Sequence, residues 1–360
     1  SIFMPQHHIP TVEVFDGNEQ QDCGLGHACN FCPKEPECQL DKIEHNTVLI
    51  RERLAQVKWI ILVMANKGGV GKSTVSANLS VALANNGFRV GLADADIHGP
   101  NAPRIFGLQS DRMKVTKAGI DVGQFSSEHI KHPLAIGSLG FLLPEQDTPV
   151  VWRDAYKHDY IHHMIGSFNW GTLDYLVVDM PPGTGNELIT LTDLLEGSNM
   201  RSLLVSPADA VALQDTLKMS RFCKERGVPI LGLVENYAGT VCPHCGGEID
   251  LFPRAPEIEQ FEQQGIETLA RLPFSADIAK GAAAGVPATT IPNSLMAELF
   301  DPIIMACKAE AELEQQEMVK GSIVDSIQQE LDSENLAPEQ AEMMKQLLAQ
   351  EQQRIKDSLS

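Results

Sequence analysis

The sequence predicts an α/β fold in which a mostly parallel β-sheet is covered by helices on both faces. Between about residues 59 and 299, short apolar runs alternate with stretches of helical periodicity. A glycine-rich loop follows the first apolar run and opens a helix, and aspartates stand at the ends of two later runs. Continuous apolar runs of this kind are typical of strands that are buried on both faces.

Five apolar runs are expected to form strands. They are Trp59–Met64, Arg89–Ala93, Leu173–Asp179, Ser202–Ser206 and Pro229–Val234. The helix after the glycine-rich loop is indicated by four apolar residues that recur at i, i+4, i+7 and i+8, namely Val75, Leu79, Ala82 and Leu83. Strand, glycine loop and helix therefore follow one another in the order that a phosphate-binding unit requires.

Composition divides the 360 residues into a core and two flanking segments. The core, residues 46–308, carries the alternating pattern, and residues 1–45 form a cysteine-rich segment with little aliphatic periodicity, which we expect to need a ligand for order. Residues 309–360 carry 12 acids against 4 bases and form an acidic helical tail. Its apolar stripe predicts a helix and leaves two alternatives for its role. The helix either has no partner, and caps the core or frays in solvent, or it docks on a partner. The stripe consists of Met344, Leu347, Leu348, Ile355 and Leu359.

Charge and hydropathy argue against several classes of partner. The chain has 28 Lys and Arg residues against 48 Asp and Glu residues, a net charge of −20, which repels nucleic acids and anionic lipid surfaces. Its apolar runs fall far short of the ~20 residues that span a bilayer. Residues Ser1–Pro10 lack the cationic start and apolar stretch of a signal peptide. We therefore expect a cytoplasmic protein with neither nucleic-acid nor membrane partners, in which metal binding rather than disulfide formation accounts for most of the eight cysteines.

The glycine-rich loop predicts an ATP and Mg²⁺ site. Its backbone N–H groups can turn toward phosphate oxygens, Lys72 neutralises the β- and γ-phosphates, and the Ser73 hydroxyl can complete the magnesium shell. Asn66 stands where the ordinary pattern has glycine, and asparagine also tolerates a left-handed backbone. The loop consists of Asn66, Lys67, Gly68, Gly69, Val70, Gly71, Lys72, Ser73 and Thr74.

The second lysine of the loop, Lys67, resembles the deviant Walker A branch of P-loop NTPases, the SIMIBI type that includes MinD, ParA and the nitrogenase iron protein. In that branch the lysine reaches the nucleotide of a partner subunit, so the resemblance implies a homodimer with ATP between the subunits. It also implies that Asp96, the second acid of Asp94-Ala95-Asp96, orients the attacking water. Lys67, Lys72 and Asp96 are thus the expected catalytic residues.

Two strand-end aspartates are expected to complete the magnesium site. Asp94 ends the second strand and is assigned to the magnesium shell, and Asp179 ends the third and can hold a magnesium-bound water. In the turn that follows Asp179, Gly183 can sense the γ-phosphate. Any one strand-end aspartate is often only a helix cap, but these two segments in register with a phosphate loop, three stretches in all, predict an ATPase.

A cysteine pair lies just beyond the fifth strand, in Cys242-Pro243-His244-Cys245. By itself this C-x-x-C spacing fits a zinc knuckle, a redox pair or an iron-sulfur site. The chain from about residue 55 to 300 resembles the Mrp family of P-loop iron-sulfur carriers, relatives of the eukaryotic cytosolic scaffolds. The motifs that carry the resemblance are Lys67–Thr74, Asp94–Asn101, Trp170-Gly171 with Leu173-Asp174-Tyr175, Asp179–Gly185, Glu235-Asn236 and the cysteine pair.

The resemblance implies that Cys242 and Cys245 of two subunits hold one four-iron four-sulfur cluster at the dimer interface, and that Asn236 recognises adenine. A cubane cluster takes four thiolates, which two pairs in a symmetric dimer supply. The chain departs from the family at Asn186, where aspartate is usual, and at Asn101, where serine is usual.

The N-terminal cysteines Cys23, Cys29, Cys32 and Cys38 look like the ferredoxin-like extension of the eukaryotic scaffolds with a shorter first gap. Four thiolates in one segment fit a second four-iron four-sulfur cluster or a structural zinc. The two remaining cysteines, Cys223 and Cys307, are expected to be buried structural thiols. Three histidines have a spacing compatible with zinc but no evident further ligand, namely His158, His162 and His163.

These observations predict an ATP-hydrolysing homodimeric carrier that assembles an iron-sulfur cluster and transfers it to apo-proteins. The alternative is an ATP-gated electron donor that resembles the nitrogenase iron protein, with the N-terminal cluster as a redox relay. A positioning ATPase of the MinD or ParA type is disfavoured by the acidic charge and by the lack of a basic amphipathic membrane helix.

Overall fold

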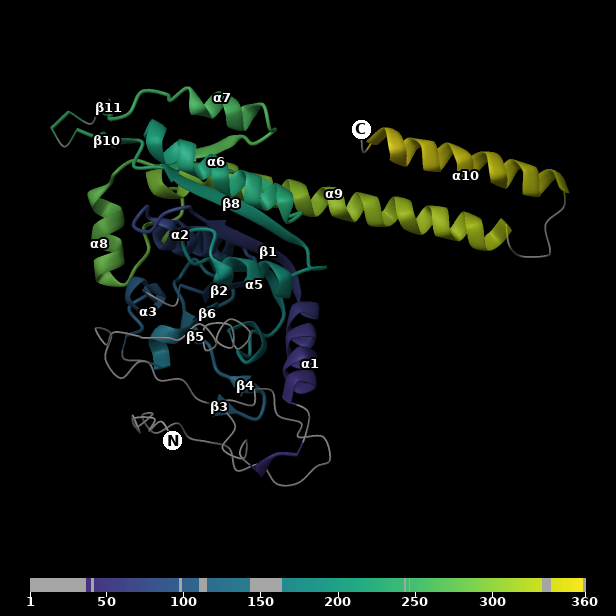
Figure 1. Cartoon of the computed structure of the whole chain (residues 1–360), viewed down its shortest axis with the longest axis horizontal. Coiled ribbons are helices and arrows are strands. Elements are labelled where there is room, and N and C mark those ends of the chain that lie inside the picture. The colour runs from purple at the N-terminus through teal and green to yellow at the C-terminus, as the bar shows by residue number, and fades with distance from the viewer. Residues whose placement is uncertain are drawn as a thin grey trace. The chain divides into compact units, whose positions relative to one another are not determined.

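The computed structural model describes residues 37–39, 42–96, 99–109, 115–142, 164–242, 244–245, 247–331 and 338–358. The chain divides into two compact units, Ser1–Ile303 and Ile304–Ser360. The first unit contains the sheet and its covering helices (Figure 1). The residues of the second unit that the structure describes are helical.

In the described chain, the first unit is built on an eight-stranded sheet with the order β12-β9-β8-β1-β7-β2-β6-β5. Neighbouring strands are parallel except for β5, which is antiparallel to β6. The predicted mostly parallel sheet is confirmed, and all five expected strands are present with slightly different ends. The strands are β1 (Val57–Met64), β2 (Val90–Asp94), β5 (Gly123–Phe125), β6 (Leu134–Ser138), β7 (Leu173–Asp179), β8 (Met200–Pro207), β9 (Ile230–Asn236) and β12 (Thr268–Arg271).

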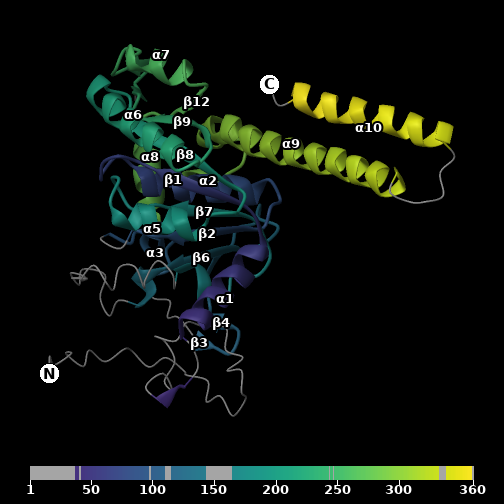
Figure 2. The same ribbon diagram turned by 45° about the vertical axis from the view of Figure 1, so that its right-hand side comes forward.

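Helices cover both faces of this sheet because the chain leaves the centre in two directions. It runs from β1 to β2 on one side, and from β7 past β1 to β8 and β9 on the other. Right-handed crossovers therefore place α2 (Lys72–Asn85) on one face and α5 (Asn186–Leu194) and α6 (Ala210–Glu225) on the opposite face (Figure 2). The predicted helix after the glycine-rich loop is α2.

Shorter elements complete the first unit. Two small antiparallel hairpins stand apart from the main sheet, β3 (Val115–Thr116) with β4 (Gly119–Ile120), and β10 (Gly239–Val241) with β11 (Glu248–Asp250). The other helical segments are α1 (Lys42–Ala55), α3 (Ala102–Ile105), α7 (Glu257–Glu262), α8 (Ala276–Ala284), the beginning of α9 (Leu295–Leu331) and the 3₁₀ turns Leu139–Leu142 and Ala288–Thr290.

The core of the sheet lies around β1 and α2. From Ile60 to Met64 every side chain is at most 1% exposed, as expected for a central parallel strand. Polar side chains of α2 are buried as well, and two of them bond within the helix. The hydroxyls of Ser76 and Ser80 donate to carbonyls one turn earlier, at 3.0 and 2.8 Å. These hydroxyls can therefore be buried against the sheet without losing their hydrogen bonds.

The second unit contains the remainder of α9 and the helix α10 (Pro338–Ser358). On the apolar stripe of α10, Met344 and Leu348 are half-buried and Leu347 is exposed, while Leu359 lies outside the described residues. Neither these helices nor any other in the described ranges has an apolar stretch that could cross a bilayer.

Candidate nucleotide site and cysteine pair

The predicted nucleotide-binding residues meet at one edge of the sheet. Parallel strands carry their carboxyl ends on the same edge, so the loop after β1, Asp94 at the end of β2 and Asp179 at the end of β7 are neighbours. The register pairs Asp94 directly with Asp179, and the backbone N–H of Ala95 donates to the Asp179 carbonyl at 3.0 Å. Strand pairing thus places two carboxylates side by side next to the glycine-rich loop.

Two glycines give the loop its path. Gly69 and Gly71 have φ angles of +78° and +86°, in the left-handed region that favours glycine. At Gly71 a side chain is also excluded by contact, since an added Cβ would lie 2.2 Å from Asn236 Nδ2 and 2.8 Å from Tyr237 Oη. Gly71 directly precedes α2, so the helix N-terminus faces the pocket that the loop encloses.

This pocket has a volume of about 400 Å³ and collects most of the predicted residues. Except for Asn66 and Val70, every residue of the predicted loop lines it, as do Asp96 and Asn101. Residues that the sequence did not single out also contribute. They include Arg104 of α3, Pro182, Tyr237 and the small side chains Ala279, Ala282 and Ala283 of α8.

Lys72 forms a buried ion pair in this site. Its side chain is 6% exposed, and Nζ lies 2.5 Å from Oδ1 of Asp179, which is 107 residues away in the sequence. The Ser76 hydroxyl lies 3.1 Å from the same Asp179 oxygen, so its one proton is shared between this oxygen and the Lys72 carbonyl. Lys72 thus lines the pocket that the loop encloses, with Asp179 as its counter-ion.

Asp94 is the second buried carboxylate. Its Oδ2 accepts hydrogen bonds from the Ala102 N–H and the Ser138 hydroxyl, each at 3.0 Å. Burial, and then the charge of Asp179, raise the pKa of Asp94 to about 7. Two adjacent carboxylates and a serine hydroxyl at the start of α2 are hard oxygen donors, the type that Mg²⁺ prefers. The residues present therefore fit the predicted magnesium ion, which would relieve the repulsion between the carboxylates.

Lys67 contacts a residue of its own chain. Its ammonium group forms an ion pair with Asp215 of α6, which also accepts a hydrogen bond from Lys218 at 2.9 Å. Hydrogen bonds from the two lysines lower the pKa of Asp215. The Lys67 side chain remains 55% exposed, so it lies at the surface of the pocket and can exchange this partner for another.

Tyr237 lines the pocket, and the neighbouring Asn236 packs against the loop. The buried Asn236 side chain donates from Nδ2 to the Val70 carbonyl at 2.9 Å, so the predicted adenine-binding residue contacts the phosphate loop. Tyr237 has a φ of +56°, one of two non-glycine residues with positive φ among the described residues. Its ring packs on Phe274 with the centroids 5.7 Å apart. Tyr237 was missed because no spacing or composition signal marks it; only its position next to Asn236 could have drawn attention to it.

The predicted cysteine pair lies on the turn between β10 and β11. Cys242 donates its N–H to the Gly247 carbonyl at 2.9 Å, which closes the turn, and its side chain is half-exposed while Cys245 is exposed. Hydrogen bonds from the N–H groups of Cys245 and His244, and then from the Cys245 thiol, lower the pKa of Cys242. In the described ranges, no third His, Cys, Asp or Glu joins the pair to make a metal-binding group.

The other predicted metal ligands and thiols are described only in part. Cys38 is half-exposed and forms no disulfide. Cys223 and Cys307 are buried, as predicted, and burial raises the pKa of both thiols, that of Cys307 to about 12. Six predicted residues lie outside the described part of the chain, namely Cys23, Cys29, Cys32, His158, His162 and His163.

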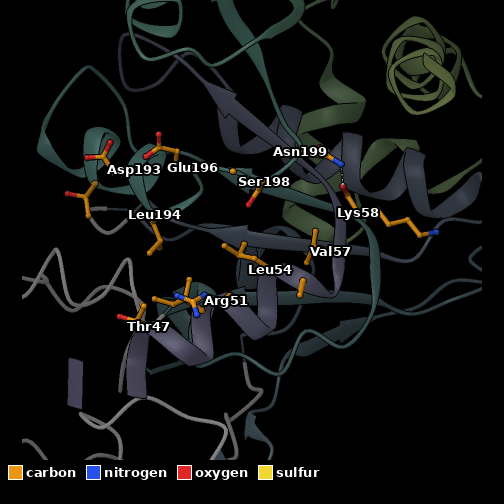
Figure 3. Close-up of a pocket in the computed structure, with 14 residues that line it drawn as sticks. Thr47, Arg51, Leu54, Val57, Lys58, Asp193, Leu194, Glu196, Ser198 and Asn199 are labelled. Atoms are coloured by element: carbon orange, nitrogen blue, oxygen red, sulfur yellow. Dashed lines mark hydrogen bonds between the residues drawn. The ribbon is translucent and has the colours of Figure 1, made fainter. Parts of the chain in front are cut away.

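A separate hollow of about 870 Å³ lies at the opposite edge of the sheet (Figure 3). Its walls come from α1, the beginning of β1 and the segment from α5 to β8. Arg51 and Leu54 of α1 face Asp193, Leu194 and Glu196 across it. None of the residues predicted for catalysis, nucleotide binding or metal binding lines this hollow.

The fold and the phosphate loop define a P-loop NTPase of the deviant Walker A type. Residues 56–307 match the ParA family described as the NUBPL iron-transfer P-loop NTPase. The chain belongs to this family, in agreement with the resemblance to the Mrp-type carriers.

Individual relatives agree with this family. The iron-sulfur cluster carrier protein of Methanocaldococcus jannaschii is 34% identical over 261 residues, which cover 72% of this chain and 88% of that protein. The protein of the same name from Saccharolobus solfataricus is 37% identical over 240 residues, 66% of this chain and 78% of the relative. Among solved structures, a nucleotide-binding protein from Archaeoglobus fulgidus in complex with ADP superimposes with a TM-score of 0.58 and 31% identity, covering 69% of this chain and 94% of that one.

Proposed function

We propose that this chain is an ATP-hydrolysing carrier that binds a four-iron four-sulfur cluster between two copies of itself and transfers the cluster to apo-proteins. The observation that carries the proposal is the cysteine pair, Cys242 and Cys245. Both side chains are accessible on a turn that begins six residues after Asn236, whose side chain contacts the phosphate loop. The cluster is cargo, so an exposed and readily exchanged site suits the task.

The geometry of the pair supports sharing between two subunits. Each chain offers two adjacent thiols, and a cubane cluster takes four thiolates. A two-fold axis that passes between two copies of the β10–β11 turn would supply the complete set. The lowered pKa of Cys242 favours the thiolate, which is the form that binds iron.

The ATPase reaction is assigned to the residues of the phosphate pocket. Lys72 would neutralise charge on the β- and γ-phosphates, and Asp96 would orient the attacking water. Ser73, Asp94 and Asp179 would hold Mg²⁺, which would supply positive charge to offset the negative charge of the phosphates. Lys67 would leave Asp215 and reach the nucleotide of the partner subunit, so that ATP binding and dimer geometry become linked.

The N-terminal cysteines Cys23, Cys29, Cys32 and Cys38 are proposed to hold a second four-iron four-sulfur cluster. We also propose the division into the segment 1–45, the NTPase domain 46–308 and the tail 309–360. Asn236 is proposed as the residue that contacts adenine. Apo-proteins that need an iron-sulfur cluster are the proposed clients.

Anaerobic reconstitution with iron and sulfide tests the proposal. In a chain whose four N-terminal cysteines are replaced by alanine, the pair should bind about four irons per dimer, with visible absorption. Cys242→Ala combined with Cys245→Ala should abolish this iron, and transfer to an apo-enzyme should vanish with it. Cys223→Ala is the matched control, because it removes a buried thiol and should leave iron binding unchanged.

Two results would contradict the carrier. One zinc per chain with no iron after reconstitution would identify a zinc knuckle. A cluster that reduces an acceptor on ATP addition but is never transferred would favour the ATP-gated electron donor.

A further inference from the structure

The phosphate loop and the cysteine pair are connected through one short segment. Asn236 ends β9, Tyr237 and Ala238 follow, and β10 begins at Gly239 and leads directly to Cys242. Asn236 holds the loop through its hydrogen bond to the Val70 carbonyl at 2.9 Å. The same few residues therefore border the nucleotide pocket at one end and the cysteine pair at the other.

Tyr237 is the side chain of this segment that faces the nucleotide pocket. It lines the pocket together with Lys72 and Asp96, and its Oη lies 2.8 Å from where a Cβ of Gly71 would stand. Its backbone has a φ of +56°, a conformation that is unfavourable for residues other than glycine and asparagine. Such strain persists only where the surroundings hold the residue in place.

Phe274 continues the connection from Tyr237 to the hairpin. The Tyr237 ring packs on the Phe274 ring at 5.7 Å between centroids. The backbone of Phe274 is bonded to β10 twice, since its N–H donates to the Gly239 carbonyl at 2.6 Å and its carbonyl accepts from the Thr240 hydroxyl at 3.0 Å. A displacement of the Tyr237 ring therefore acts on β10, the strand that leads into Cys242.

A second link to the hairpin is weaker. Arg271 of β12 lies 3.5 Å from Asp250 of β11 and 3.5 Å from Glu235 of β9. The Arg271 and Asp250 side chains are 42% and 60% exposed, and exposed ion pairs contribute little because solvent screens them. The aromatic contact and its two backbone hydrogen bonds are thus the stronger connection between the pocket and the hairpin.

We propose that Tyr237, acting through Phe274, is the positioning residue that links nucleotide occupancy of the phosphate loop to the geometry of the Cys242 and Cys245 turn. A nucleotide that moves the loop at Gly71 moves the Tyr237 ring, and the hairpin follows. The inference rests on the proposed function in one respect only, namely the identity of the cargo that Cys242 and Cys245 bind. Coupling between two sites is reciprocal, so cargo on the pair would change nucleotide affinity by the same factor.

Thiol alkylation of the full, cluster-free chain tests this link. Reduced protein is treated with iodoacetamide without nucleotide, with saturating Mg–ADP and with saturating Mg–ATP, and peptide mass spectrometry follows Cys242 and Cys245. In the parent, nucleotide should change the Cys242 rate by about fivefold or more, the lower end of ordinary coupling. In Tyr237→Asn the Cys242 rates with and without nucleotide should agree within about twofold, because asparagine accepts the positive φ but lacks the ring.

Three controls make the result specific. Tyr237→Phe keeps the ring and should keep the nucleotide effect. Phe274→Ala removes the next contact of the link, and because Phe274 is 61% exposed this variant should fold even if Tyr237→Asn does not. The buried thiol of Cys223 reports general opening and should react equally slowly in every sample.

The inference is overturned if nucleotide leaves the parent's Cys242 rate unchanged. It is also overturned if the nucleotide effect persists in Tyr237→Asn or, should that variant not fold, in Phe274→Ala. A failure of the proposed function would be seen in a different experiment, the reconstitution with iron and sulfide, which involves no alkylation. There the double variant Cys242→Ala, Cys245→Ala would retain its iron.

Discussion

Replacing Lys72 by methionine should destabilise the nucleotide-free protein as well as abolish ATP binding. Methionine keeps much of the length of the side chain but removes its charge. The Lys72 side chain is 6% exposed and that of its partner Asp179 is 4% exposed, with the carboxylate of Asp94 adjacent. The variant therefore leaves two buried carboxylates without their cation.

The size of the effect follows from two bounds. Removing one partner of a buried ion pair costs about 3–5 kcal/mol. A buried carboxylate that has lost its cation can be protonated instead. For an aspartate with the ordinary pKa near 3.9, protonation costs about 4 kcal/mol at pH 7, at 1.36 kcal/mol per pH unit. We expect a loss of about 3–4 kcal/mol in the free energy of unfolding at pH 7. At pH 5 protonation costs only about 1.5 kcal/mol, so the loss should be smaller.

Urea unfolding in EDTA without nucleotide, at pH 7 and pH 5, measures this difference. The matched control is Lys58→Met, because Lys58 pairs with Asp174 at 2.7 Å but is 68% exposed, and its loss should cost at most about 1 kcal/mol. A Lys72→Met, Asp179→Asn double variant should regain part of the stability without regaining ATP binding. Equal destabilisation by Lys72→Met and Lys58→Met would refute the reasoning. A cost of Lys72→Met that is as large at pH 5 as at pH 7 would refute it too.

Three further predictions concern the same site and the cysteine turn. Because burial and Asp179 raise the pKa of Asp94 to about 7 against 3.8 for an ordinary aspartate, the folded state binds the extra proton, so metal-free protein should lose stability as the pH rises from about 4 to about 7. Asp94→Asn should flatten this slope in urea midpoints, and equal slopes in variant and parent would contradict the assignment. Asp96→Ala should bind ATP within a few-fold of the parent but hydrolyse it at least about 100-fold more slowly, as measured by equilibrium binding and phosphate release; an equal loss of both would show a binding role instead. The alkylation rate of Cys242 should rise with pH, with an apparent pKa below the ordinary value of 9.0, since backbone N–H groups stabilise the thiolate. Cys245→Ala, which removes the hydrogen bond from the Cys245 thiol, should move that pKa upward. A midpoint at or above 9.0 in the parent would contradict the effect.

Much of the fold and of the nucleotide site could be predicted because the signals are local. The apolar runs that became β1, β2, β7, β8 and β9 are continuous in the sequence, and the phosphate loop lies within one of their connections. Other elements carry too little local signal. The strands β10 and β11 have three residues each, and all three residues of β11 are exposed, so neither strand has the apolar run that marks a buried strand.

The positions of individual side chains depended on contacts that no spacing encodes. Lys67 was expected to reach toward a partner subunit, and the structure places it on Asp215 of its own chain. This arrangement does not test the expectation, but it identifies the contact that would have to break. Tyr237 and Phe274, which lie 37 positions apart in the numbering, meet only because their backbones are folded against each other.

By itself, the sequence determined which chemical groups this protein has available, since the phosphate loop, the strand-end aspartates and the cysteine pair are each recognisable from residue type and spacing. It also determined the sheet, because burial on two faces demands continuous apolar runs. Only the tertiary structure decided which groups act on one another. Placing β7 between β1 and β2 brings Asp179 to Lys72 and to Asp94. Strand order and packing depend on the free energy of the whole chain, so the buried ion pair, the raised pKa of Asp94 and the contact of Tyr237 with the loop appear only once the chain is folded.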